Sequence, residues 1–79
     1  MSDEKMGEEV VDARGEHCPM PLLRAKRALR LLPSGAVLKV LSTDAGSERD
    51  FESFARIAGH GVCCEKLPDK VLQLTITKA

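Results

Sequence analysis

The apolar run from Ala36 to Ser42 constrains the fold of this chain more than any other segment. It contains β-branched valines and is nearly continuous in apolar character, as is typical of a strand that is covered on at least one face and flanked by neighbours. A second short apolar segment, Val10-Val11 with Ala13, lies one helix length earlier. A strand–helix–strand unit of this length crosses over right-handed in nearly all cases, so we expect the two strands to pair in parallel.

The stretch between these two strands has the pattern of an amphipathic helix. Pro19 and Pro21 suit a first helical turn, because the missing N–H of proline is not needed there and its φ is preset. Apolar residues then recur at helical spacing, at Leu22, Ala25, Leu29 and Leu32. The Pro-Ser-Gly sequence at 33–35 ends the pattern. The sequence therefore predicts a first helix from Pro19 to about Leu32.

The second half of the chain predicts one more helix and two strands. Ser47 is expected to cap the second helix, with Asp50 in the position of a capping-box carboxylate and Gly59 at the end. Its apolar face would be Phe51, Phe54, Ala55 and Ala58. Residues 61–67 and 71–77 are expected to be strands joined by a tight turn at 68–70. Leu72, Leu74 and Ile76 alternate with polar residues, which predicts one covered and one open sheet face.

The order of these elements predicts an α+β fold. We expect a two-layer α/β sandwich, βαβαββ, with a four-stranded mixed sheet and two helices on one face. A chain of 79 residues makes one domain with one small core. Residues 1–9 are charged and have few apolar side chains, so we expect a flexible tail there and a single domain over 10–79.

Composition excludes several functional classes. Two phenylalanines and no tryptophan or tyrosine leave little to stack on bases, so direct nucleic-acid binding is not expected. The chain has no membrane-length apolar stretch and no secretory leader, which predicts no membrane association and a cytoplasmic location. Three cysteines fit a reducing compartment better than a disulfide framework. Zinc-site spacings are missing, so we expect no metal site, and the small core of a chain of this length predicts no cofactor pocket.

Cys18 is the main candidate for chemistry. It lies directly before the first predicted helix, in the segment Asp-Ala-Arg-Gly-Glu-His-Cys-Pro-Met-Pro at 12–21. A helix N-terminus offers unpaired N–H groups and the positive end of the dipole, and both favour a thiolate. The position therefore predicts a nucleophilic cysteine with a lowered pKa. His17 could support it with a positive charge, or could be an exposed loop residue.

Five further residues are expected to position this thiol rather than to react. Gly15 lets the backbone turn sharply before the helix, and Asp12 can accept N–H bonds from the same loop. Pro19 and Pro21 set the start of the helix. Asp50 could hydrogen-bond near Cys18, although capping the second helix is the assignment we adopt from the sequence.

The formal net charge is zero, yet basic residues gather on the first helix. Residues 17–43 contain no acid and five bases: Arg24, Lys26, Arg27, Arg30 and Lys39. Because Arg24, Arg27 and Arg30 recur every three residues, they form a ridge along one side of the helix. We expect this ridge to dock an acidic partner protein or, as a weaker alternative, RNA phosphate. The other alternative is a solvated helix face.

The motif Asp-x-x-Gly-x-x-Cys-Pro-x-Pro, which ends in a CPxP sequence, resembles the TusA/SirA family of small sulfur-carrier proteins. Three later blocks resemble the same family: Gly35 before a strand ending in Ser42-Thr43-Asp44, then Asp50-Phe51, then Gly59-His60. The resemblance implies a fold similar to the C-terminal domain of translation initiation factor three. It also implies that Cys18 carries sulfane sulfur as a persulfide.

The resemblance further implies a cytoplasmic sulfurtransferase that acts as a persulfide carrier without a cofactor. Its sulfur donor would be a cysteine desulfurase or a rhodanese-like protein. The acceptor protein would belong to a relay for tRNA thiolation, molybdenum-cofactor synthesis or dissimilatory sulfur oxidation. We expect a monomer.

Two alternatives to the carrier stay open. One is a non-enzymatic regulatory or interaction module that docks acidic partners through the basic first helix. The other is a redox switch, because adjacent strand residues point to opposite faces and only one of Cys63 and Cys64 can belong to the core. The exposed member could resolve a persulfide on Cys18 or form a disulfide with it.

Overall fold

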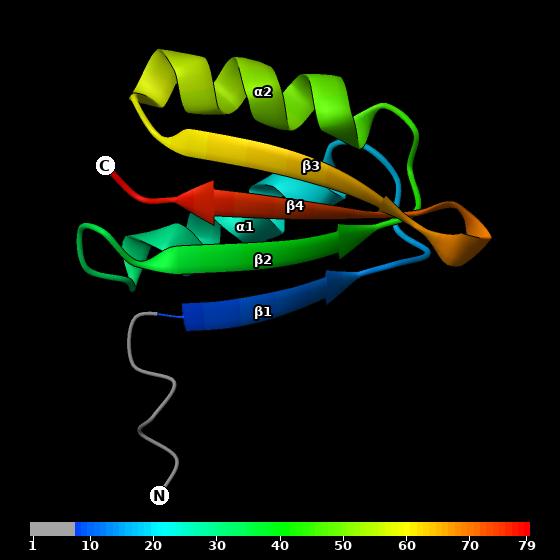
Figure 1. Ribbon diagram of the computed structural model, residues 1–79, viewed down its shortest axis with the longest axis horizontal. Coiled ribbons are helices and arrows are strands. Elements are labelled where there is room, and N and C mark those ends of the chain that lie inside the picture. The colour runs from blue at the N-terminus through cyan, green and yellow to red at the C-terminus, as the bar shows by residue number, and fades with distance from the viewer. Residues whose placement is uncertain (1–7) are drawn as a thin grey trace, which may run out of the picture.

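The computed structural model describes residues 8–79, which form strands and helices in the order βαβαββ (Figure 1). The elements are β1 (Glu8–Ala13), α1 (Met20–Arg30), β2 (Val37–Ser42), α2 (Ser47–Ala58), β3 (Gly61–Leu67) and β4 (Val71–Thr77), with the short 3₁₀ turn η2 (Pro68–Lys70) before β4. The predicted α+β class and element order are confirmed. Most of the predicted tail, residues 1–7, lies outside the described residues. Glu8 and Glu9 belong to β1, and the single domain over 10–79 stays a prediction.

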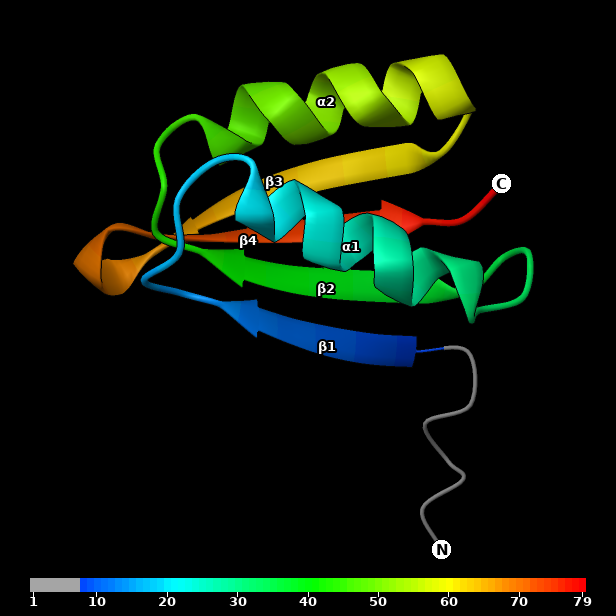
Figure 2. The same cartoon turned by 180° about the vertical axis from the view of Figure 1, so that it is seen from behind.

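The strands form one mixed sheet in the order β1-β2-β4-β3. β1 pairs with β2 in parallel, with Val11 opposite Val40, as the crossover rule predicted. β4 pairs antiparallel with both β2 and β3. Figure 1 looks onto the sheet face that no described helix covers, and Figure 2 shows α1 on the other face with α2 running beside β3.

The core lies between the helices and the covered face of the sheet. Its fully or almost fully buried members come from both helices and from three strands: Ala13, Ala25, Leu29, Leu38, Val40, Phe51, Leu74 and Ile76. The alternating burial along β2 shows that every second side chain of this strand enters the core. Phe51 is the largest of the fully buried side chains, so α2 is anchored at its first turns. Of the predicted apolar face of α2, Phe51 and Ala55 are buried, whereas Ala58 is exposed.

The first helix is shorter than predicted at both ends. Pro19 is its N-cap, and the helix ends at Arg30 rather than at Leu32. The N–H groups of Leu31 and Leu32 bond to carbonyl oxygens three residues back, so the α-helix gives way to a tighter 3₁₀-type turn. The ammonium group of Lys78 then binds the carbonyl oxygens of Leu29 and Leu32, at 2.7 and 2.5 Å. The end of α1 is thus satisfied by a residue from the far end of the chain.

None of the helices in residues 8–79 is long and apolar enough to cross a membrane.

Candidate functional site

The loop between β1 and α1 places Cys18 on the surface just before the helix. Gly15 turns the chain with φ +84°, a left-handed conformation that glycine adopts without strain. Its N–H donates to the hydroxyl oxygen of Thr43 at 2.9 Å, which ties this loop to the segment that follows β2. Cys18 is exposed and directly precedes Pro19, the N-cap of α1.

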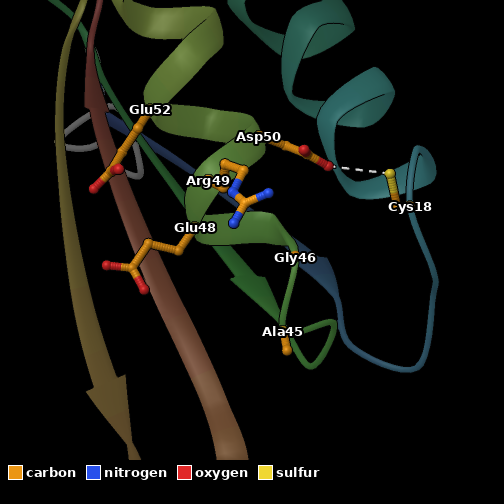
Figure 3. A pocket seen from close by; sticks show the side chains of 7 residues that line it. All are labelled: Cys18, Ala45, Gly46, Glu48, Arg49, Asp50 and Glu52. Atoms are coloured by element: carbon orange, nitrogen blue, oxygen red, sulfur yellow. Dashed lines mark hydrogen bonds between the residues drawn. The ribbon is translucent and has the colours of Figure 1, made fainter.

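Two aspartates from the second half of the fold hold Cys18. Its backbone N–H donates to Asp44 Oδ2 at 2.5 Å, and its thiol donates to Asp50 Oδ2 at 3.0 Å (Figure 3). Asp44 follows β2, while Asp50 lies in the first turn of α2. The other oxygen of Asp44 accepts the N–H of Gly46 at 3.0 Å. The site is therefore assembled from three segments that are distant in sequence.

The pKa of the Cys18 thiol is raised from its ordinary value, not lowered as the position before a helix predicted. The hydrogen bond to Asp50 is the main cause, followed by desolvation and by the negative charges of Asp50 and Asp44. A nearby carboxylate stabilises S–H and disfavours S⁻. The prediction of a thiolate was wrong because it rested on the local helix, whereas the carboxylates of Asp44, after β2, and Asp50, in α2, lie at the thiol. The protonated form of the Cys18 thiol is therefore favoured.

Two buried serines join the segments that carry these aspartates. Ser42 at the end of β2 and Ser47 at the start of α2 place their hydroxyl oxygens 2.7 Å apart, and both side chains are buried. Ser42 Oγ also accepts the N–H of Asp44 at 3.1 Å. The prediction that Ser47 caps α2 is therefore wrong: Gly46 is the N-cap, and the side chain of Ser47 is buried. Asp50 is likewise bonded to Cys18 instead of completing a capping box.

Beside Cys18 the surface is hollowed, with a volume of about 500 Å³. The lining is mostly from the start of α2 and consists, with Cys18, of Ala45, Gly46, Glu48, Arg49, Asp50 and Glu52. In Figure 3 Asp50 points at Cys18, while Glu48 and Glu52 point away from it. Such an open, charged hollow suits the approach of another protein's side chain.

Asp12, although part of the motif, is paired within its own loop. Its carboxylate accepts the backbone N–H of Arg14 at 3.1 Å and side-chain N–H groups of Arg14 at 2.9 and 2.8 Å. These bonds lower the pKa of Asp12 to about 2. Of the motif prolines, Pro19 is exposed at the N-cap and Pro21 is buried in the first turn of α1. Asp12 thus shapes the loop and makes no recorded bond to Cys18.

The three arginines of the predicted ridge differ in their surroundings. Arg24 is half-buried, and its guanidinium lies 2.5 Å from Glu16 Oε2, so part of its charge is neutralised. Arg27 and Arg30 are exposed. The same helix exposes Met20 and Leu23, each at 45%. Met20 and Leu23 lie in the first turn of α1, next to the Cys18 loop, whereas Arg27 and Arg30 lie in its last turn.

Cys63 and Cys64 point to opposite faces of the sheet. Cys64 packs against the core cluster, and burial raises its pKa, whereas Cys63 is exposed. Cys63 lies opposite Thr75 of β4, on the open face. Neither lines the hollow at Cys18. All three cysteines are free, and residues 8–79 contain no group of three or more His, Cys, Asp or Glu side chains suited to a metal ion.

Asp44 is the partner of Cys18 that sequence reasoning missed. A signal for it existed, because parallel strands end at the same edge of a sheet. β1 leads into the Cys18 loop, and β2 leads two residues later to Asp44. The parallel pairing that the sequence predicted therefore already brings the two segments together.

Comparisons with known proteins indicate the family of this chain. The model of the family described as Sulfurtransferase TusA matches residues 9–78. A putative sulfur carrier protein of Neisseria meningitidis is 44% identical over 71 residues, covering 90% of this chain and 96% of the relative. The sulfur carrier protein TusA of Allochromatium vinosum is 47% identical over 53 residues, covering 67% and 70%. The crystal structure of a SirA-like protein from Desulfitobacterium hafniense superposes with a TM-score of 0.81 at 30% identity, covering 87% of this chain and 95% of that chain.

Proposed function

We propose that Cys18 carries sulfane sulfur as a persulfide between two proteins, because this chain belongs to the sulfurtransferase TusA family. Relatives over most of its length are named sulfur carrier proteins, which supports a sulfur-carrier role. The observation that carries the assignment to Cys18 is its position: an exposed thiol at the mouth of an open hollow. Cys63 and Cys64 lie outside that hollow.

Carrier chemistry needs a thiol that another protein's persulfide can reach. Cys18 attacks the outer sulfur of the donor persulfide, a new S–S bond forms on Cys18, and the donor's S–S bond breaks. The electron pair of the broken bond stays on the donor cysteine, which leaves as a thiol after taking up a proton. No oxidant or reductant is consumed, and no cofactor takes part. Delivery to the acceptor repeats the same exchange in the opposite sense.

The donor in this proposal is a cysteine desulfurase or a rhodanese-like protein, and the acceptor is a cysteine-bearing protein. The relay would serve tRNA thiolation, molybdenum-cofactor synthesis or dissimilatory sulfur oxidation in the cytoplasm, with the carrier acting as a monomer. A protein partner docks best where apolar and charged side chains are exposed together near the reacting atom. Met20 and Leu23 at the start of α1 supply the apolar part of such a surface, and Arg27 and Arg30 in the last turn of the same helix supply the charge.

The test of Cys18 is sulfur loading followed by mass spectrometry. The reduced protein is incubated with a cysteine desulfurase and cysteine, or with polysulfide, and intact and peptide masses are recorded. We expect the wild type to gain one reducible sulfur on the Cys18 peptide and Cys18→Ser to gain none, with Cys63→Ser and Cys64→Ser as controls that still load. A gain on Cys63 or Cys64 that survives Cys18→Ser would favour the non-enzymatic interaction module instead.

Docking through α1 is tested by charge reversal. Arg27→Glu with Arg30→Glu should slow donor-dependent loading, because lost electrostatic steering mainly lowers the association rate. Loading by polysulfide should not change, since no partner is involved. Arg56→Glu, in the last turn of α2, is the matched control. Equal rates of donor-dependent loading in all variants would show that the basic residues of α1 are ordinary solvated surface and do not dock the donor.

A further inference from the structure

The carboxylate of Asp50 is the direct partner of the Cys18 thiol. The two side chains meet at 3.0 Å, and in Figure 3 Asp50 is the hollow-lining residue that points at the sulfur. Its position is well defined, because the next residue, Phe51, is fully buried in the core. Asp50 is thus anchored by the fold against the reacting atom.

We propose that Asp50 distinguishes the empty carrier from the loaded one: it holds the proton of the empty Cys18 thiol and repels the persulfide anion of the loaded form, so that the carrier releases its sulfur more readily. This inference rests on the proposed carrier function and adds a role for Asp50 at the same site.

In the empty state, ionisation of Cys18 would place a thiolate against the Asp50 carboxylate. A second carboxylate, Asp44, is bonded to the backbone N–H of the same residue. The hydrogen bond to Asp50 is the main cause of the raised pKa of Cys18, and desolvation and the charges of Asp50 and Asp44 act in the same direction. The other charged groups at the hollow are Glu48, Arg49 and Glu52 of α2, and the charge of His17 acts on Asp44. The two carboxylates thus oppose the thiolate that the N-terminus of α1 by itself favours.

Loading changes what faces Asp50. In the balanced exchange Cys18–SH + R–S–SH gives Cys18–S–SH + R–SH, so the departing donor sulfur leaves as a thiol. The inner sulfur then has no hydrogen to donate, and the outer sulfur lies about 2 Å farther out. A persulfide is more acidic than a thiol, so its outer sulfur releases its proton to solvent and the loaded group is an anion at neutral pH. Asp50 therefore stabilises the empty form by a hydrogen bond and destabilises the loaded form by repulsion.

The first measurement is the pKa of the empty Cys18, obtained from the pH dependence of its alkylation by iodoacetamide. All variants also carry Cys63→Ser and Cys64→Ser, so that a single thiol reacts. Asp50→Asn should lower the pKa, and each unit raises the alkylation rate at neutral pH about tenfold. Glu65→Gln, on the exposed part of β3, removes the same charge outside the hollow and should leave the pKa of Cys18 unchanged.

The second measurement concerns the loaded state. Each variant is loaded with polysulfide and equilibrated with glutathione, and intact mass gives the fraction that still carries sulfur. Asp50→Asn should retain a larger fraction than the wild type and Glu65→Gln. Circular dichroism confirms the fold, and Asp50→Ser replaces Asp50→Asn if that variant unfolds.

Equal pKa values in Asp50→Asn and the wild type, or equal retained fractions, would overturn the inference. The loading of wild-type Cys18 does not depend on either comparison, so the proposed carrier function would survive. Loss of wild-type loading would instead overturn the carrier function itself.

Discussion

Replacing Ser42 with alanine removes the hydroxyl that joins the end of β2 to the start of α2. In the native protein this oxygen lies 2.7 Å from Ser47 Oγ and accepts the N–H of Asp44 at 3.1 Å. Ser42 is fully buried and Ser47 is 2% exposed, so water does not replace the lost partner. The substitution therefore leaves the Ser47 hydroxyl buried and unsatisfied.

The expected loss of stability is about 2 kcal/mol. Leaving one buried polar group without a partner costs about 1–3 kcal/mol, and the weaker bond to Asp44, which is only half-buried, adds less. A chain of this size has a free energy of unfolding of roughly 4–12 kcal/mol, so the loss is a large share of it. Removing both hydroxyls is less costly than the sum of the single changes, because no unsatisfied group remains. We expect a coupling energy of about 1 kcal/mol in the double-mutant cycle.

Urea denaturation followed by far-UV circular dichroism measures these free energies for the wild type, Ser42→Ala, Ser47→Ala and the double variant. Ser34→Ala, on the exposed loop before β2, is the control and should change stability little. The reasoning would be refuted if the two single effects were additive in the double variant. A Ser42→Ala effect no larger than that of Ser34→Ala would refute it equally.

Two further predictions concern local structure. Gly59 ends α2 with φ +84°, and the position that an added methyl group would take has open space around it. Gly59→Ala should therefore lower the free energy of unfolding by about 1 kcal/mol through backbone strain alone, as measured by the same urea denaturation. Arg14→Ala should raise the pKa of Asp12 from about 2 toward its ordinary range, as followed by NMR titration. Because the pKa of Asp12 is lowered in the folded state, its contribution to stability is present above its ordinary pKa and disappears as the pH falls toward 2. Arg14→Ala should remove this acid dependence of the free energy of unfolding.

The element order was predictable because it rests on local patterns. Each of these patterns belongs to one segment of the chain: β4 alternates apolar and polar residues, β2 is mostly apolar, and proline and glycine mark the turns. Helix ends were less predictable, because they depend on partners elsewhere in the chain. The end of α1 is set partly by Lys78, and the start of α2 by the bond between Ser42 and Ser47.

The class of the fold, the parallel pairing of the first two strands and the candidate thiol Cys18 all follow from the amino-acid sequence, because periodicity and the CPxP motif are properties of neighbouring residues. The direction of the pKa shift of that thiol depends on the folded structure. Asp44 and Asp50 lie 26 and 32 residues from Cys18 in sequence, and the hydrogen bond between the thiol and Asp50 is the main cause of its raised pKa. Electrostatic energy depends on distance in space, which no local pattern contains.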